Sequence, residues 1–484
     1  MSFSRYFLKV ALPTAVFKVG NSSHKIDTDN FFENNFISGF CIDSRKIKQG
    51  EIFLALEGEN VDGHDFVEDA IKNGAIGIII NQEKEWILQK IKKDVLSGKL
   101  IIIVKNTLNA LIQLAKVWRS RFCYPVVGIT GSVGKTTTKE IVSHIFKIVN
   151  FTAYVSYKNQ NSLIGLCLNI LNMRKDHKVA VFEVGISKIG EMEVKADILR
   201  PTIALITCIA HSHTYGLGKL LDIANQKNQI FKYFNSCDIG IINGDQPILS
   251  NNNYNYPTIS FGMKIKNHLR AGKIRIEYEK NGNDLHTNFM LKIYNQKISL
   301  RLKGNHEGLI YNSLAASSIA YLLGISVNDI IKGLQTFSGV ESRFEKKIAS
   351  CGNGTIINDC YNANPKSMKA AIFAFSRIKC SGVKIAVLGD MLELGEREVF
   401  WHRQVGRVLR KVLDLDFLIL VGNLAKHIAK TAPMKINIIF VSDWIDAEKV
   451  VRDILKKYPK NHSFVLAKSS KAMNLNKMVE QLSN

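Results

Sequence analysis

The strongest constraint on the fold of this chain is a glycine-rich segment at residues 131–136, with the sequence Gly-Ser-Val-Gly-Lys-Thr. An apolar run at 126–130 precedes it, and apolar residues at helical spacing follow over 141–149. A strand, a glycine loop and a helix in this order hold a polyphosphate, because backbone N–H groups and the helix N-terminus face the anion. We therefore predict a nucleotide-phosphate site made by Gly131, Ser132, Val133, Gly134, Lys135, Thr136 and Thr137.

Two side chains of this loop carry chemistry of their own. Lys135 adds a mobile positive charge beside the phosphates, and Thr136 lies where a hydroxyl can bind Mg²⁺. The nucleotide is therefore expected to be bound together with the metal.

The length and composition are those of a globular protein of several domains. At 484 residues the chain should hold three domains, at about one per ~150 residues. The apolar segment at 6–17 is interrupted by Lys9 and Pro13, so we interpret it as an ordinary first segment without membrane insertion. The eight cysteines are scattered without a C-x-x-C pair, which argues against zinc and disulfides and favours the cytoplasm.

The net charge of +23 raises the possibility of a nucleic-acid partner. The lysines are spread evenly, however, and no basic run is interleaved with aromatic residues as a stacking surface would be. We therefore expect no nucleic acid to bind, while anionic small substrates benefit from the positive field.

Patterning divides the chain into three α/β regions. Residues 1–120 alternate strand-like and helical runs, and residues 121–337 carry the glycine loop, several buried-type strands and an alternating stretch typical of an antiparallel meander. Residues 338–484 alternate strand and helix again, which predicts a second open, mostly parallel sheet of the Rossmann type.

Polar residues stand at the ends of several predicted strands. Glu183 ends the strand at 179–183, and His213 lies in the loop after the strand at 202–207. Because ligands collect at the carboxyl ends of parallel strands, Lys135, Glu183 and His213 can converge. In the first region, two loops carry Ser44, Arg45, Asp62 and His64, which suit a diphosphate or sugar, although turn chemistry explains them equally well.

Two further clusters follow strands of the last region. One is Asn358-Asp-Cys-Tyr-Asn-Ala-Asn-Pro365, and the other is Gly389-Asp-Met-Leu-Glu393. The first cluster contains more polar groups than a helix cap needs, which favours a function there.

Taken together, these motifs resemble the Mur ligases of peptidoglycan synthesis. The resemblance is carried by 131–137, Glu183-Val-Gly185, the His213 loop and 359–365. The segments 361–368 and 386–396 are similar to those of the family member that acts last, which adds D-alanyl-D-alanine.

The resemblance implies three domains, which bind the UDP substrate (1–120), bind ATP (121–337) and complete the site with a Rossmann-like fold (338–484). It also implies a reaction that belongs to cell-wall biogenesis. ATP phosphorylates the terminal carboxylate of UDP-N-acetylmuramoyl-tripeptide, and the amine of D-alanyl-D-alanine attacks the acyl phosphate. The expected enzyme is a cytoplasmic monomer that uses ATP and Mg²⁺.

The resemblance also assigns residues to roles. Lys135, Glu183, His213 and Lys227 are implied as catalytic, with Thr136, Glu183, His213 and carbamylated Lys227 as metal ligands; Arg343, Asp359 and Asn362 are implied at ATP, and Ser44, Arg45, Asp62 and His64 at the UDP substrate. From the helical pattern alone, Lys227 would be a solvated surface charge.

Two other functions are compatible with the glycine loop, and other parts of the sequence argue against both. Another amide ligase of the superfamily, similar to folylpolyglutamate synthase, lacks the motifs at 361–365 and 390–395. A basic P-loop ATPase acting on nucleic acid should show an acidic pair after a strand, whereas Phe182 precedes Glu183.

Overall fold

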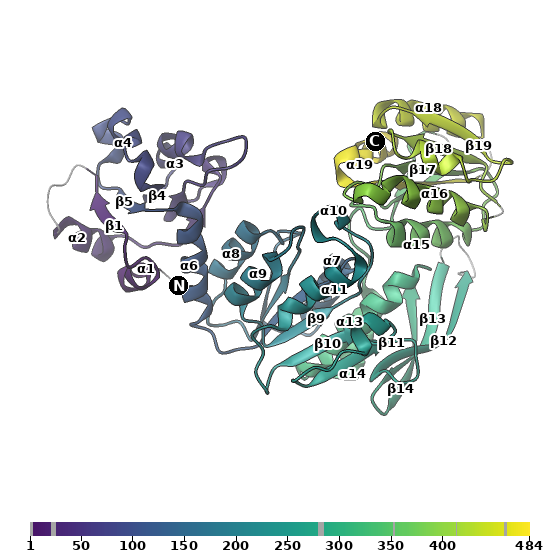
Figure 1. Cartoon of the computed structure of the whole chain (residues 1–484), viewed down its shortest axis with the longest axis horizontal. Coiled ribbons are helices and arrows are strands. Elements are labelled where there is room, and N and C mark those ends of the chain that lie inside the picture. The colour runs from purple at the N-terminus through teal and green to yellow at the C-terminus, as the bar shows by residue number, and fades with distance from the viewer. Residues whose placement is uncertain (1–2, 21–25, 279–284, 352–353, 413, 459–461) are drawn as a thin grey trace. The chain divides into compact units, whose positions relative to one another are not determined.

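The protein is described by a computed structural model that covers residues 3–20, 26–278, 285–351, 354–412, 414–458 and 462–484. The chain forms two compact units: Met1–Gly128, Thr152–Val184 and Glu193–Thr202 make the first, and Ile129–Phe151, Gly185–Met192 and Ile203–Asn484 make the second. Three sheets of five, nine and six strands succeed one another along the sequence (Figure 1). This confirms the three-domain α/β fold class.

The five-stranded sheet lies in the first unit and has the order β1-β5-β4-β3-β2. Its strands run parallel except β1, which is antiparallel to β5. Its elements are α1 (Arg5–Ala11), β1 (Val16–Val19), α2 (Ile26–Asn34), β2 (Gly39–Cys41), η1 (Ser44–Lys46), β3 (Glu51–Leu54), η2 (Gly63–Phe66), α3 (Val67–Lys72), β4 (Gly77–Asn81), η3 (Gln82–Lys84), α4 (Ile87–Lys90), α5 (Lys93–Leu96), β5 (Leu100–Val104) and α6 (Thr107–Arg119).

The nine-stranded sheet has the order β14-β13-β12-β11-β10-β9-β6-β8-β7. Strands β12 to β14 form the antiparallel meander predicted from the alternating pattern. The elements are β6 (Val126–Thr130), α7 (Lys135–Ile148), β7 (Ala153–Val155), α8 (Leu163–Leu171), β8 (Val179–Glu183), α9 (Glu191–Leu199), β9 (Ile203–Ile206), α10 (Thr214–Leu217), α11 (Leu220–Asn228), η4 (Gln229–Phe231), β10 (Ile239–Asn243), α12 (Pro247–Ser250), β11 (Thr258–Gly262), β12 (Leu269–Tyr278), β13 (Leu285–Ile293), β14 (Gln296–Lys303), α13 (Glu307–Leu322) and α14 (Val327–Thr336).

The six-stranded sheet lies in the second unit and has the order β15-β16-β20-β17-β18-β19. It is parallel apart from β15, which is antiparallel to β16. The elements are β15 (Glu345–Ile348), β16 (Gly354–Asn358), α15 (Pro365–Ser376), β17 (Lys384–Gly389), η5 (Gly395–Arg397), α16 (Glu398–Leu409), β18 (Phe417–Val421), α17 (Lys426–Ala429), β19 (Asn437–Val441), α18 (Trp444–Lys457), β20 (Ser463–Lys468), η6 (Lys471–Met473) and α19 (Leu475–Ser483).

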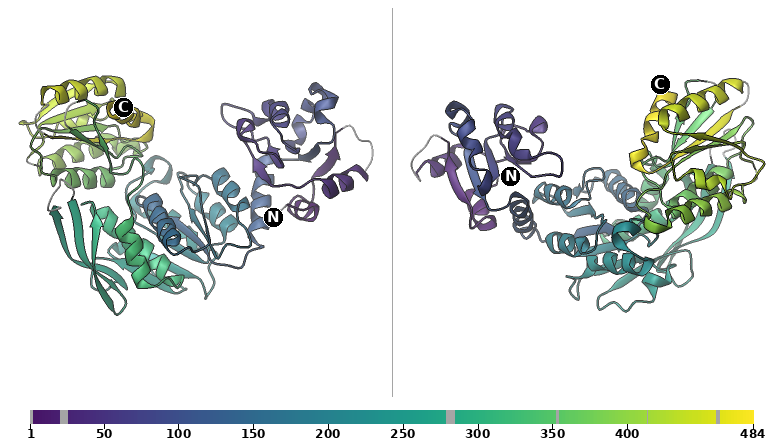
Figure 2. Two further views of the ribbon diagram at one scale, coloured as in Figure 1. Left: turned by 180° about the vertical axis from the view of Figure 1, so that it is seen from behind. Right: turned by 45° about the horizontal axis from the view of Figure 1, so that its top comes forward.

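Helices cover both faces of this last sheet because its strands are apolar at successive positions. In β17, Ala386 and Leu388 pack with α15 and α16, while Ile385 and Val387 pack with α18 and α19. Successive strand residues point to opposite faces, so a continuous apolar run needs a helical layer on each side. Figures 1 and 2 show these two layers.

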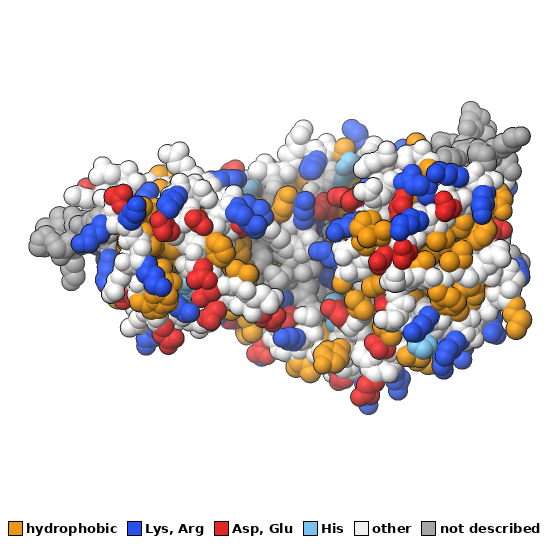
Figure 3. Space-filling view, turned by 90° about the horizontal axis from the view of Figure 1, so that it is seen from above, with side chains coloured by type: hydrophobic (Ala, Val, Ile, Leu, Met, Phe, Trp, Pro, Cys, Tyr) orange, Lys and Arg blue, Asp and Glu red, His pale blue; other side chains and the backbone are white. Residues whose placement is uncertain are grey.

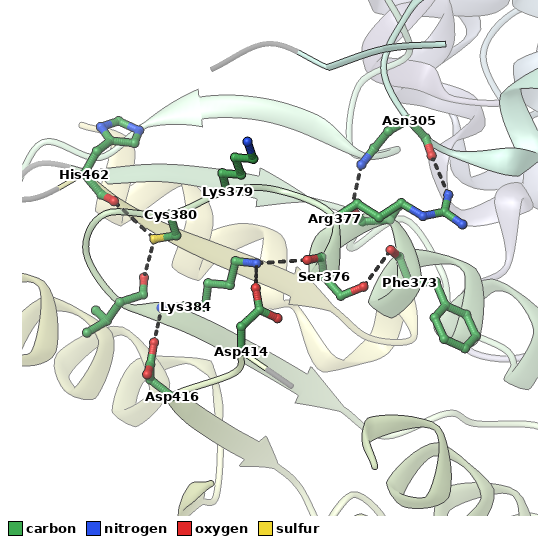
Figure 4. A network of polar contacts seen from close by, with 12 residues as sticks. Asn305, Phe373, Ser376, Arg377, Lys379, Cys380, Lys384, Asp414, Asp416 and His462 are labelled. Atoms are coloured by element: carbon green, nitrogen blue, oxygen red, sulfur yellow. Dashed lines mark hydrogen bonds and ion pairs between the residues drawn. The ribbon is translucent and has the colours of Figure 1, made fainter. Parts of the chain in front are cut away.

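A buried polar network joins the six-stranded sheet to the segment before α13 (Figure 4). Lys384 is buried, forms an ion pair with Asp414 and donates from Nζ to the Ser376 carbonyl at 3.1 Å. Asn305 is also buried and donates to the Ala374 carbonyl at 2.6 Å. These bonds satisfy buried polar groups that would otherwise cost about 1–3 kcal/mol each.

The described residues contain no helix with the length and apolar character needed to span a bilayer. On the face seen in Figure 3, lysine and arginine side chains lie among aspartate and glutamate side chains. The cysteines at 41, 123, 167, 208, 237, 351, 360 and 380 are all free thiols.

Candidate active site

The glycine loop connects β6 to α7, as the sequence predicted. Every residue of β6 is buried, and the loop turns through Gly131 (φ +142°) and Gly134 (φ +91°), which is the N-cap of α7. These φ values are costly for residues with a Cβ, so both glycines are needed for the turn. Lys135 begins the helix and donates from Nζ to the Gly131 carbonyl at 2.7 Å.

The segment after β9 holds the loop in place. Ser132 donates its backbone N–H to the Cys208 carbonyl at 2.8 Å and its hydroxyl to the Ala210 carbonyl at 2.9 Å. The Thr207 hydroxyl donates to the Val133 carbonyl at 2.6 Å. These hydrogen bonds fix the conformation of the loop. The first turn of α7 follows directly and includes half-buried Thr137.

A guanidinium group contacts the Thr136 hydroxyl. Arg343 donates from Nη2 to the Thr136 hydroxyl at 2.8 Å, and its guanidinium lies over the Tyr361 ring at 3.9 Å from the centroid. Ser342 and Phe344, on either side of Arg343, both have left-handed backbones, with φ of +56° and +57°. Strained residues of this kind cluster at functional sites, where they hold a side chain in a required orientation. Here the oriented side chain contacts a residue 207 positions away in the sequence.

His213 lies close to the charged groups of this loop. It has a left-handed backbone with φ +53° and forms an ion pair with Glu393. Burial lowers the pKa of His213 below its usual value; Glu393 acts against this, and the positive charges of Lys135 and Lys227 act with it. Lys135, His213 and Lys227 are therefore near enough to interact electrostatically.

Lys227 is a buried lysine rather than a surface charge. It belongs to α11, and its side chain is only 1% exposed. The interpretation as a solvated helical lysine, which composition alone favoured, is therefore wrong. Burial of an ammonium group is costly and favours the neutral amine.

Glu183 ends β8 in the first unit. It is 2% exposed, and its carboxylate accepts a hydrogen bond from Asn161 Nδ2 at 2.7 Å. Its backbone N–H donates to the Ser156 hydroxyl at 3.1 Å. Because Lys135, His213 and Lys227 belong to the second unit, the convergence of Glu183 with them stays a prediction.

Asp359 and Asn362 follow β16 and are joined by a lysine. Buried Lys468, at the end of β20, donates from Nζ to Asp359 Oδ2 at 2.6 Å and to the Asn362 carbonyl at 3.1 Å. The Asn362 side chain is exposed and accepts a hydrogen bond from the Ala363 N–H at 2.9 Å. In this arrangement Asp359 orders the 359–365 turn, and its predicted contact with ATP stays untested.

The two loops predicted for the UDP substrate are turns with internal bonds. Asp43 caps η1, and the Arg45 guanidinium beside it holds the pKa of that carboxyl well below its usual range. Ser44, next to them, is buried. Arg45 itself is 84% exposed, so its charge remains accessible to an anion.

Both ring nitrogens of His64 have hydrogen-bond partners. Its Nδ1 lies 2.6 Å from Asp62 Oδ1, and its Nε2 accepts from the Asn81 N–H at 2.9 Å. This pairing fixes the neutral tautomer with hydrogen on Nδ1. His64 and Asp62 therefore shape the loop, and their predicted substrate contact stays untested.

The fit of a magnesium ion follows from the donors present. The described residues hold no group of three or more His, Cys, Asp or Glu that could bind a metal. Mg²⁺ bound with a nucleotide needs only one or two protein ligands, since phosphate oxygens and water complete its shell. The Thr136 hydroxyl, which faces the Arg343 cation, fits that requirement.

Sequence reasoning missed several residues of this neighbourhood. Asn312 of α13 lies against Gly134, since a Cβ at that glycine would be 2.4 Å from Asn312 Oδ1. Thr207, Tyr361 and Lys468 also contact predicted site residues. Tyr361 lies within a recognised polar cluster, whereas Thr207 had no signal because its role depends on tertiary contacts.

Comparison with known families decides the assignment. The catalytic domain of the Mur ligase family matches residues 36–119, the Mur ligase middle domain matches 129–320, and the Mur ligase glutamate ligase domain matches 342–470. The chain belongs to the Mur ligase family. It is therefore an ATP-dependent, amide-forming ligase.

Relatives and solved structures narrow the position within the family. The chain is 32% identical over 454 residues to a UDP-N-acetylmuramoyl-tripeptide–D-alanyl-D-alanine ligase of Bacillus subtilis, covering 93% of this chain and 94% of that one. A ligase of the same name from Buchnera aphidicola is 34% identical, with 92% of each chain covered.

Two solved structures share the whole fold. MurF from Acinetobacter baumannii superposes with a TM-score of 0.83 at 25% identity, covering 100% of this chain and 99% of that one. MurF from Thermotoga maritima, in complex with ADP, gives a TM-score of 0.76 at 27% identity, covering 92% and 97%. Folylpolyglutamate synthase from Mycobacterium tuberculosis shares the fold alone, at 14% identity. The predicted family and branch are thus confirmed, and the folylpolyglutamate alternative is not favoured.

Proposed function

We propose that this Mur ligase joins D-alanyl-D-alanine to UDP-N-acetylmuramoyl-tripeptide, using ATP and forming ADP and phosphate. The observation that carries the proposal is the Arg343 contact with Thr136 of the glycine loop, which brings a cation to the phosphate site. The activity named for relatives that match almost the whole chain supports this choice of substrates.

The reaction needs two steps because a free carboxylate is a poor acyl donor. In the first, a carboxylate oxygen of the tripeptide attacks the γ-phosphorus, a C–O–P bond forms and ADP leaves. In the second, the dipeptide amine attacks the acyl carbon, phosphate leaves with the carboxylate oxygen, and the amine loses a proton. Both steps bring anions together, so positive groups must be in place beforehand.

Three side chains of the second unit serve the phosphates. Lys135 is proposed to reach the β- and γ-phosphates, and Arg343 the γ-phosphate. The Thr136 hydroxyl would hold Mg²⁺, which when bound would neutralise phosphate charge and orient the γ-phosphoryl group.

His213, Lys227 and Glu183 serve the carboxylate that is phosphorylated. We infer that Lys227 reacts with CO₂ to form a carbamate, which turns a buried cation into an oxygen donor. Its 1% exposure supports this, since the neutral amine that attacks CO₂ is favoured by burial. Carbamate, Glu183 and His213 would then hold a second metal.

The remaining assignments concern the surroundings of the reaction. Ser44, Arg45, Asp62 and His64 are proposed to form the UDP-binding loops, with Arg45 reaching the diphosphate. Asp359 and Asn362 are proposed to face ATP. We expect a monomer in the cytoplasm without a nucleic-acid partner. The free cysteines support a reducing compartment, and the mixed charges on the face seen in Figure 3 argue against a basic surface there.

The direct test is phosphate release from the purified protein. We expect release only when ATP, a UDP-linked tripeptide and D-alanyl-D-alanine are all present, with one peptide bond formed per phosphate. Tripeptides ending in different diamino acids serve as the substrate panel, and folate with glutamate serves as the control for the alternative ligase. Phosphate release with ATP, folate and glutamate, but not with ATP, the UDP-linked tripeptide and D-alanyl-D-alanine, would overturn the proposal.

A further inference from the structure

Of the two polar clusters that follow strands of the last region, the proposed reaction leaves Gly389-Asp-Met-Leu-Glu393 without a role. The structure places Glu393 of this segment against His213, with which it forms an ion pair. The two residues come from different sheets of the second unit, since one follows β9 and the other follows β17. Their contact therefore links the six-stranded sheet to the candidate active site.

Hydrogen bonds fix the segment that carries Glu393. The Asp390 carboxylate accepts hydrogen bonds from the backbone N–H groups of Leu424 at 3.0 Å and Ala425 at 2.7 Å. His402, which is fully buried, accepts the Met391 N–H at 3.0 Å. A position fixed by this many bonds can aim the next side chain with little freedom.

The backbone of Glu393 also binds the His213 loop directly. Its carbonyl accepts hydrogen bonds from the Tyr215 N–H at 3.3 Å and from the Thr214 hydroxyl at 3.4 Å. Nearby, the rings of His211 and Trp401 lie 4.5 Å apart. The two segments therefore contact each other at several points, one of which is the ion pair.

Both members of the ion pair have strained backbones. Glu393 has φ +64° and His213 has φ +53°, in the left-handed region that favours glycine. Neither position is occupied by glycine or asparagine, and the Glu393 side chain is 59% exposed, so core packing does not explain its choice. Strain of this kind persists where the side chain itself is needed.

We propose that Glu393 is a positioning residue that fixes the His213 ring through Nδ1. The Glu393 carboxylate lies against Nδ1, where its negative charge favours the hydrogen on that nitrogen and leaves Nε2 as the ring nitrogen able to act as a ligand. Carboxylates orient metal-binding histidines in this way in many proteins. The inference rests on the proposed function, in which His213 serves the reaction. It makes the orientation of the His213 ring depend on its contact with the 389–395 segment.

The test is the tautomer of His213, read by nitrogen NMR of histidine-labelled protein at pH 8. His213→Gln identifies the resonance. The parent is expected to carry the hydrogen on Nδ1, and so is Glu393→Gln, because an amide oxygen still accepts that bond. Glu393→Ala is expected to shift the ring toward the Nε2–H tautomer. An Nε2–H ring in the parent, or no change in Glu393→Ala, would overturn the proposal.

Kinetics and stability add a second, independent comparison. Glu393→Ala should lower kcat by about 10–100-fold, the usual range for losing such a partner, while KM for ATP changes little. Glu393→Gly should melt at or above the parent temperature, since glycine relieves the left-handed strain, yet lose the same activity. Glu396→Ala, an exposed carboxylate in the next turn, is the matched control and should behave as the parent. Full activity in Glu393→Gly would contradict the assignment.

The two proposals fail differently. If the protein does not ligate the dipeptide, turnover is absent in the parent, but the tautomer comparison still stands. If ligation is normal and the tautomer is insensitive to residue 393, only the role of Glu393 is wrong.

Discussion

Gly131→Ala is the substitution whose cost the structure defines most completely. A Cβ at this position would lie 1.9 Å from Thr207 Oγ1 and 3.1 Å from the Cys208 nitrogen. The backbone also has φ +142°, a region in which alanine is strained. Strain of about 1–2 kcal/mol and overpacking of about 1–3 kcal/mol predict a destabilisation of about 2–5 kcal/mol.

The damage should reach the nucleotide site as well as the fold. To avoid the added methyl group, Thr207 must give up its 2.6 Å bond to the Val133 carbonyl, which helps to hold the loop. We therefore expect weaker binding of ADP, measured by calorimetry, together with a lower urea midpoint.

A second glycine allows the cost of backbone strain to be measured without a steric clash. Gly324 also has a positive φ, +80°, but a Cβ there meets nothing within 4 Å. Gly324→Ala should lose only about 1–2 kcal/mol and bind ADP normally. Equal losses in the two variants, or unchanged ADP binding in Gly131→Ala, would refute the steric argument.

Four further substitutions test other contacts. Lys135→Ala should abolish ligation with an unchanged urea midpoint, because the amine serves phosphate; normal turnover at saturating ATP would contradict the loop assignment. Arg343→Ala should raise KM for ATP by roughly 10–150-fold, the equivalent of a charge-assisted bond of about 1.5–3 kcal/mol, measured by initial rates. Lys227→Ala should be nearly inactive and partly restored by acetate, whereas a fully active variant would rule out the carbamate. Burial lowers the pKa of His402, so the unfolded chain takes up a proton that the folded protein does not. Stability should therefore fall as pH drops below about 6.5, and His402→Gln should reduce the slope of that dependence in urea titrations from pH 8 to 5, whereas an unchanged slope would contradict this.

Much of the fold could be predicted because its strands are local apolar runs. The strands predicted at 126–130 and 179–183 begin and end where the pattern placed them. By contrast, β1 and β2 have four and three residues, too few for a distinct pattern, and they belong to the sheet only through their neighbours. Helix α11 ends at Asn228, so Ile230 and Phe231 lie in the 3₁₀ turn that follows.

The candidate site was predictable where backbone chemistry sets it. The glycines at 131 and 134 are required by positive φ values, and Lys135 follows from its place at the helix start. The burial of Lys227 was not predictable, since its position on a helix says nothing about what packs over it. The pairing of His213 with Glu393 depends on contact between two sheets that 180 residues of sequence separate, beyond the reach of local patterns.

The central claim is that the tripeptide carboxylate is activated as an acyl phosphate on this chain. The most direct measurement follows ¹⁸O from that carboxylate during ligation. A UDP-linked tripeptide with both terminal carboxylate oxygens labelled is converted in unlabelled water, and the released phosphate is analysed by mass spectrometry. The account predicts one ¹⁸O atom in each phosphate, because the bridging oxygen leaves with phosphorus. Phosphate without the label, formed at the same rate as the peptide bond, would contradict it.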